Sequence, residues 1–140
     1  MRLAGHPVHP MLVHFPIVFW SCAVAADVAG MAAPSPLAAQ LAFATLALGC
    51  ASGLLAMIAG IHDFAGLAKD SPARDTAVIH LMAMCSAWLI FLLALALHGS
   101  PSMPEISILA LVTTVVGFGV MAFGGWLGGK LVYKFGVGRL

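Results

Sequence analysis

Four long apolar stretches alternate along the chain with short segments rich in Gly, Pro, Ser and charged residues. Each stretch is close to the roughly 20 residues that an α-helix needs to cross the hydrocarbon core of a bilayer. The pattern predicts transmembrane helices at residues 10–29, 37–61, 76–97 and 106–128. Because the connections are short, successive helices must run antiparallel. Residues 1–140 are therefore expected to form a single all-α domain, a four-helix bundle with up-down-up-down order.

The amino-acid composition indicates whether this bundle lies in water or in a membrane. Hydrophobic residues make up 62% of the chain and charged residues only 8%, whereas charged residues are about 25% of an ordinary soluble domain. We therefore predict a polytopic membrane protein in contact with the lipid bilayer, and we expect no nucleic-acid partner. The serines inside the apolar stretches have no paired base and acid, so nothing in the chain indicates nucleophilic catalysis.

The basic residues predict the orientation of the bundle. They lie in three segments: before the first helix, between the second and third helices, and after the fourth. In an up-down-up-down bundle these segments share one face, so the positive-inside rule places that face and both termini in the cytoplasm. The six residues are Arg2, Lys69, Arg74, Lys130, Lys134 and Arg139.

The same topology gathers five of the six histidines at that face. Three of them stand in the segment HPVHPMLVHFP, residues 6–16, where Pro10 suits the first position of a helix. Pro16 is expected to kink this helix beside His14. At 1.5 Å per residue, His14 lies about 6 Å and His80 about 7 Å below the start of its helix. Two imidazoles on different helices are thus expected to meet at one depth.

The other histidines allow plainer interpretations. His6 and His98 are expected to be ordinary interfacial residues, and His98 is the one histidine on the far side of the membrane. His9 can serve as a helix cap. His62 and Asp63, adjacent at the end of the second helix, form either a plain polar terminus or a group that orients a ligand imidazole.

Four segments of the chain form a specific combination: HPMLVHFPI at 9–17, AGIHDFAGL at 59–67, HLMAM at 80–84 and GGWLGGKLVYKFGVG at 124–138. Together they resemble the bacterial membrane-protein family called domain of unknown function 2231, over nearly the whole chain. The resemblance implies four helices in the bacterial inner membrane and a cytoplasmic polar cluster that includes His9, His14, Asp63 and His80. Some relatives are joined to Rieske-type iron–sulfur domains, which implies redox work.

A b-type haem uses histidines placed in this way, because its iron takes axial imidazoles from opposite sides while the apolar macrocycle lies between helices. We therefore interpret His14 and His80 as ligands of a haem b near the cytoplasmic side, in a module that exchanges electrons with a redox partner protein or a quinone. Glycines on the second and fourth helices would leave room for the ring. The same glycines, spaced as in small-xxx-small motifs, also predict close helix packing or a homo-oligomer.

Two alternatives stay open. A divalent transition metal, or a transported ion, could be bound by His9, His14, His80 and Asp63, with His62 as a further ligand, because imidazole and carboxylate suit such ions. Residues five apart on a helix differ by about 140°, which counts against His9 and His14 holding the same ion. A non-catalytic scaffold subunit of a larger complex would use the histidines only as caps. These residues leave open whether the chain is an enzyme.

Overall fold

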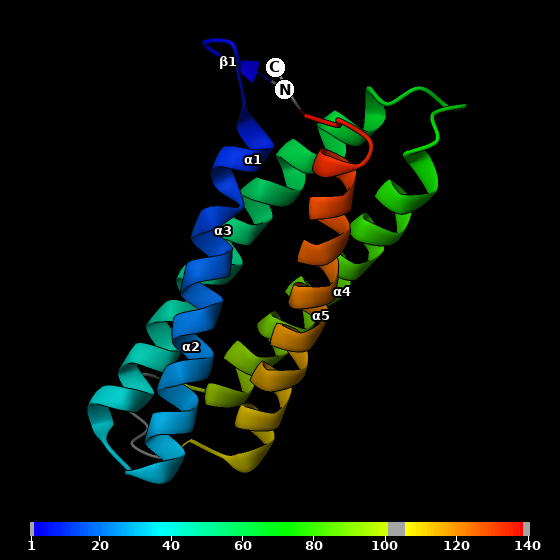
Figure 1. Ribbon diagram of the computed structural model, residues 1–140. Helices are drawn as coiled ribbons and strands as arrows, with labels where there is room; N and C mark the ends of the chain where they lie inside the picture. Colours follow the sequence, from blue (N-terminus) through cyan, green and yellow to red (C-terminus); the bar gives the residue numbers. More distant parts are fainter. Residues whose placement is uncertain (1, 101–105, 139–140) are drawn as a thin grey trace.

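A computed structural model describes residues 2–100 and 106–138 of the chain (Figure 1). With α1 and α2 taken together, four helical spans are long and apolar enough to cross a membrane, with mean hydropathy between 1.7 and 2.3. They pack antiparallel in sequence order, so the predicted all-α, up-down-up-down membrane bundle is confirmed. The helices of the described part are α1 Val8–Leu12, α2 His14–Ala32, α3 Pro36–Ala65, α4 Arg74–His98 and α5 Ile108–Tyr133.

The first span is interrupted at Val13, where α1 ends and α2 begins. Pro16 has no N–H to donate to the carbonyl of Leu12, so the hydrogen-bond ladder opens one turn before the proline. The helix is therefore interrupted at the residue before His14, where the sequence predicts a kink.

A short antiparallel hairpin precedes α1, which the hydrophobic pattern did not predict. Its strands are β1 Arg2–Leu3 and β2 His6–Pro7. The two residues between them, Ala4 and Gly5, have φ of 48° and 84°, as a tight two-residue hairpin turn requires. The all-α fold class still holds, because these strands add only four residues outside the bundle.

The two ends of the bundle carry different groups. The hairpin, α1, the loop between α3 and α4 and the last turn of α5 lie at one end, here called the amino-terminal end (Figure 1). The turn between α2 and α3 and the start of α5 lie at the opposite end. Lys69, Arg74, Lys130 and Lys134 all belong to the amino-terminal end, so the shared basic face exists. Its cytoplasmic location stays a prediction.

Small side chains fill the interior, and large apolar side chains cover the outside. On α3, for example, Ala42 is fully buried and Ala56 is 4% exposed, whereas Leu55 and Ile58 are each 57% exposed. Lipid tails are as apolar as leucine, so large residues lose nothing on the outside, while small residues inside let the helix backbones approach closely. The packing is that of a membrane bundle.

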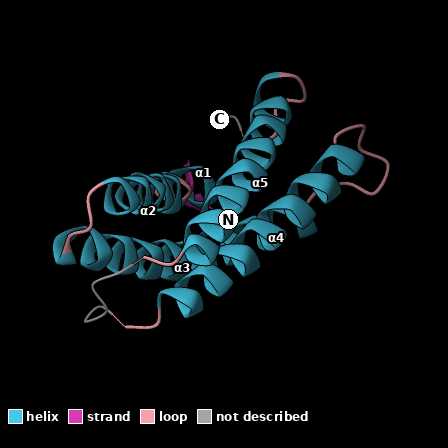
Figure 2. Ribbon diagram, turned by 90° about the horizontal axis from the view of Figure 1, so that it is seen from below, coloured by secondary structure: helices cyan, strands magenta, loops and turns pink. Residues whose placement is uncertain are grey.

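The bundle consists of two helical hairpins of the same design, α1–α2 with α3 and α4 with α5, which lie side by side in Figure 2. From Ala87 onward, the buried positions of α4 are those of α2 shifted by 71 residues. Most buried positions of α5 are likewise those of α3 shifted by a second constant offset, as Gly49 and Gly117 illustrate. Equivalent pairs on the first and third spans are Pro16 and Ala87, Trp20 and Phe91, Ala23 and Ala94, and Asp27 and His98.

Equivalent residues of α2 and α4 also meet face to face. The rings of Trp20 and Phe91 stack with centroids 4.3 Å apart and planes 10° apart, and both side chains are buried. Gly49 and Gly117, themselves equivalent, provide the space, because a Cβ at Gly49 would collide with the Trp20 indole and one at Gly117 would lie 3.2 Å from Phe91. An approximate two-fold axis therefore runs along the bundle between the hairpins. The stacked rings of Trp20 and Phe91 fill the bundle interior at the middle of this axis.

Candidate metal centre

His9, on α1, makes its hydrogen bond to α3, the second span. Its Nδ1 lies 2.8 Å from the carbonyl oxygen of Ala56. One turn further along α3, a Cβ at Gly60 would lie 3.0 Å from the His9 ring, so only glycine leaves the imidazole this close to the helix. A carbonyl oxygen can only accept a hydrogen bond. The Nδ1 of His9 therefore carries a proton, and in the neutral form of the imidazole Nε2 keeps its lone pair.

His80 repeats this arrangement in the second hairpin. Its Nδ1 lies 2.8 Å from the carbonyl oxygen of Gly124 on α5, and a Cβ at Gly128, one turn further, would lie 3.2 Å from its ring. The same reasoning puts the proton on Nδ1 and the lone pair on Nε2. His9 and His80 are 71 positions apart, the offset that relates Asp27 to His98. The two imidazoles are therefore equivalent residues of the two hairpins.

The two imidazoles lie close together, one from each hairpin. Their ring centroids are 6.4 Å apart and their planes are 80° apart. Both side chains are partly buried. Because each ring already uses its N–H on a backbone carbonyl, the two Nε2 atoms are both acceptors and cannot bond to each other. A shared electrophile, such as a metal ion, would satisfy both.

His14 lies elsewhere. Its side chain is exposed, and its Nδ1 is 3.4 Å from the carbonyl oxygen of Met11 in its own span. The imidazole that faces His80 is that of His9, so the structure replaces the predicted pairing of His14 with His80. The physical reason is angular: His9 and His14 are five residues apart and point about 140° apart around the helix, and His9 takes the inward direction.

The remaining predicted ligands do not join the pair into a larger cluster. His62 is largely exposed, and its Nδ1 lies 3.8 Å from Oδ1 of its neighbour Asp63. Within residues 2–100 and 106–138, no group of three or more His, Cys, Asp or Glu side chains could hold a metal ion. Of the predicted residues, the structure thus brings together His9 and His80.

A second histidine site, at the opposite end of the axis, was missed from the sequence. Nε2 of His98 lies 2.8 Å from Oδ1 of Asp27, with side chains 4% and 0% exposed. The expectation of an ordinary interfacial role for His98 is wrong, because the imidazole points inward between α2 and α4. An acidic residue in the middle of an apolar stretch is the signal that could have found this pair, since ionisable residues inside membranes face the bundle interior.

Comparison with known proteins then places the chain. Residues 5–140 match the family described as Predicted membrane protein (DUF2231). The chain belongs to this family. No curated protein and no solved structure gives a match. The resemblance stated from the four sequence segments is therefore confirmed, and with it the assignment to membrane proteins, whereas the chemistry rests on the geometry of the chain itself.

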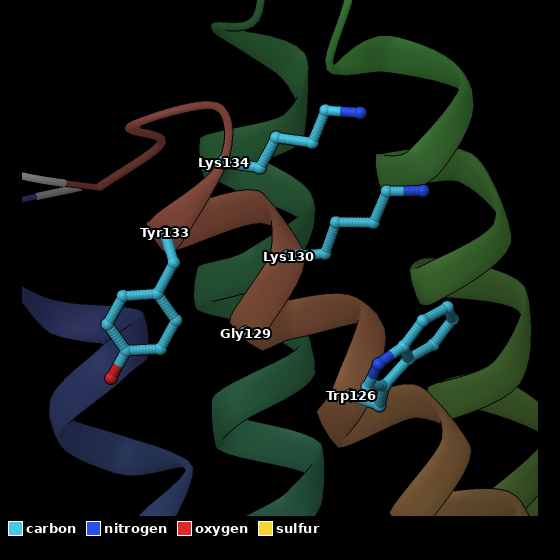
Figure 3. A pocket seen from close by; sticks show the side chains of 5 residues that line it. All are labelled: Trp126, Gly129, Lys130, Tyr133 and Lys134. Atoms are coloured by element: carbon cyan, nitrogen blue, oxygen red, sulfur yellow. The ribbon is translucent and has the colours of Figure 1, made fainter.

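A shallow hollow on the outside of α5 is the other feature of the amino-terminal end in this DUF2231 protein (Figure 3). Trp126 and Tyr133 are 63% and 80% exposed at its two sides. Nζ of Lys130 lies 5.8 Å from the Trp126 ring centroid, and Lys134 lies one turn further on. Exposed aromatic rings beside lysines are typical of the level where a helix leaves the bilayer, so this hollow belongs to the interfacial belt.

Proposed function

We propose that this DUF2231 protein is a membrane electron-transfer protein in which His9 and His80 are the two axial ligands of a b-type haem at the amino-terminal end of the bundle. One observation carries the proposal: two equivalent imidazoles, one from each hairpin, lie close together, each with its N–H committed to a backbone carbonyl. This revises the ligand pair expected from the sequence, with His9 in place of His14.

The separation of the ring centroids has the length expected for two imidazoles that share one metal ion. With metal–nitrogen bonds of about 2.0 Å and ring nitrogens about 1 Å from their centroids, two imidazoles on opposite sides of an ion have centroids roughly 6 Å apart. The observed separation of 6.4 Å is close to this value. Two imidazoles also complete the protein's share of a bis-histidine haem, because the porphyrin supplies the other donors, whereas zinc takes three or four protein ligands.

The surroundings of the pair suit an apolar cofactor. One turn nearer the amino-terminal end, Ala73, Ala77 and Leu131 form an apolar cluster, with Phe64 and Leu67 packed against it. Such side chains limit the access of water to the two Nε2 atoms.

The chain's own residues would orient the ligands. The carbonyls of Ala56 and Gly124 fix each ring's direction and tautomer, and a hydrogen bond at Nδ1 makes Nε2 a stronger donor to a metal. Gly60 and Gly128 let the rings reach these carbonyls. When bound, the haem would supply one-electron chemistry at the level of the basic loops, where a protein or quinone partner could approach.

Titration of the purified protein with haem tests the proposal. We expect saturable binding of one haem per chain, followed by the Soret absorption, and we expect His9→Ala and His80→Ala each to remove or greatly weaken it. His14→Ala is the matched control, because it deletes an exposed imidazole of the same span and should bind like the wild type.

Two outcomes would contradict the haem assignment. A folded wild-type protein that binds no haem would exclude it. Binding of zinc, copper, nickel or iron without haem, lost in His9→Ala, would instead assign the same pair to a non-haem ion.

A further inference from the structure

The pair formed by Asp27 and His98 has no part in the proposed haem site, yet it places two ionisable groups inside the bundle. Asp27 is fully buried on α2, and His98 is the last residue of α4. All the other charged side chains that the structure describes belong to the amino-terminal end, so no other described charge faces this pair. They are Asp63, Lys69, Asp70, Arg74, Asp75, Lys130 and Lys134.

Hydrogen-bond donors and acceptors fix the number of protons in the pair. Nδ1 of His98 lies 2.7 Å from the carbonyl oxygen of Ala94, which can only accept, so Nδ1 carries a proton. Nε2 lies 2.8 Å from Oδ1 of Asp27, and two lone pairs would repel at this distance. A second proton must therefore lie between Nε2 and Oδ1. The pair with this proton is neutral overall, and without it the bundle interior would hold a net negative charge.

The second carboxylate oxygen of Asp27 sets the pair apart from a purely structural ion pair. Oδ2 is buried and has no hydrogen-bond partner within residues 2–100 and 106–138. Buried polar atoms of structural pairs normally have a partner. The unused lone pair of Oδ2 can accept a hydrogen bond from a water molecule, which gives water a contact with the carboxyl group that shares the proton.

We propose that Asp27 and His98 form a proton-binding site that exchanges one proton with the side of the membrane at the opposite end of the bundle. Asp27 lies five residues before the end of α2, or about 7.5 Å at 1.5 Å per residue, so the path to that surface is short. On release, the shared proton passes to water as hydronium, the Asp27 carboxylate and a neutral His98 remain, and Nδ1 keeps its proton. No electrons move in this step.

Infrared difference spectra of the protein in lipid nanodiscs, recorded between two pH values, test the site. Labelling with ¹³C-aspartate identifies carboxyl bands. A variant with Asp63, Asp70 and Asp75 replaced by Asn keeps Asp27 as its one aspartate, so its labelled band belongs to Asp27 without any change at the pair. We expect a pH-dependent Asp27 band that is lost in Asp27→Asn and altered in His98→Gln, and retained in Thr114→Val, a buried polar control on α5.

The alternatives give different spectra. An Asp27 band that does not change with pH in the triple Asn variant would overturn the proposal and leave a structural ion pair. The same band change on addition of Na⁺ at constant pH, with choline as control, would assign the site to a metal cation instead of a proton. Because none of these measurements requires haem, a failure here leaves the haem proposal untouched, and the reverse holds too.

Discussion

The two ends of the approximate two-fold axis carry histidines in opposite circumstances. At the amino-terminal end, the axis brings together two like residues, His9 and His80, whose rings are 6.4 Å apart. At the opposite end, it brings together two complementary residues, Asp27 and His98, in direct contact at 2.8 Å. The Trp20–Phe91 stack closes the interior between them. Both pairs join the first and third spans at positions 71 residues apart, so the difference between them comes from the side chains at these positions.

The comparison shows that equivalent positions of the two hairpins can leave two side chains open to a ligand at one end and join two side chains directly at the other. When both imidazoles are neutral and their Nδ1–H groups are bonded to backbone carbonyls, the two Nε2 atoms cannot bond to each other, so each lone pair is open to a third group such as water or a metal ion. A carboxylate and an imidazole share a proton and close the gap themselves. The like pair is therefore where we propose a cofactor, whereas the unlike pair joins the two hairpins directly and is where we propose a bound proton.

Breaking the unlike pair should have the largest effect on stability. His98→Ala leaves the Asp27 carboxylate buried without its partner, and we expect the free energy of unfolding in detergent to fall by about 3–5 kcal/mol. The double variant Asp27→Leu, His98→Leu should lose much less, because apolar residues often replace a buried ion pair at little cost. A double variant that is less stable than His98→Ala would show that the pair does not act as a unit.

A smaller loss is expected where the middle of the axis is overpacked. Gly49→Ala drives a Cβ into the Trp20 indole, and inserting a methyl group into a packed interior costs about 1–3 kcal/mol. Gly125→Ala is the matched control on α5, since nothing lies within 4 Å of its added Cβ. Equal unfolding free energies for the two variants, measured by Trp fluorescence in a denaturant titration, would contradict the close packing of Trp20 against α3.

The smallest stability effect, about 1 kcal/mol, is expected at the glycines beside the like pair. In Gly60→Ala the new Cβ would lie 3.0 Å from the His9 ring and should push it off the Ala56 carbonyl. Haem affinity should therefore fall about tenfold, in line with a change of roughly 1.4 kcal/mol. Gly129→Ala, which meets only the Tyr133 ring at 3.9 Å, should bind haem like the wild type in the same titration.

The sequence predicted the bundle well, because length and hydropathy alone decide which segments can span a bilayer. It also predicted which histidines share an end, since topology follows from the order of the spans. Counting residues from the helix start predicts how deep a side chain lies, and on this basis the sequence pairs His14 with His80. It does not predict which side of the helix faces the bundle interior. The interruption at Val13 and the angle between His9 and His14 decide which of these two rings points inward.

The contact between the two hairpins through Asp27 and His98 was harder to predict from the sequence. Asp27 stands alone in an apolar stretch, and His98 ends another. Their connection becomes visible only through the constant offset of 71 residues that also relates His9 to His80 and Trp20 to Phe91. Matching buried positions of α3 and α5 often hold different residue types, as Leu46 and Thr114 or Gly53 and Met121 show, so sequence identity does not reveal the repeat.

The most direct test of the central claim is the reduced-minus-oxidised absorption spectrum of haem-supplemented protein, recorded for the wild type, His9→Ala and His14→Ala. If His9 and His80 are the axial ligands, the wild type and His14→Ala give the same low-spin b-type spectrum, while His9→Ala gives none or a high-spin form. A low-spin spectrum that survives in His9→Ala and disappears in His14→Ala would contradict this account and return the ligand role to His14.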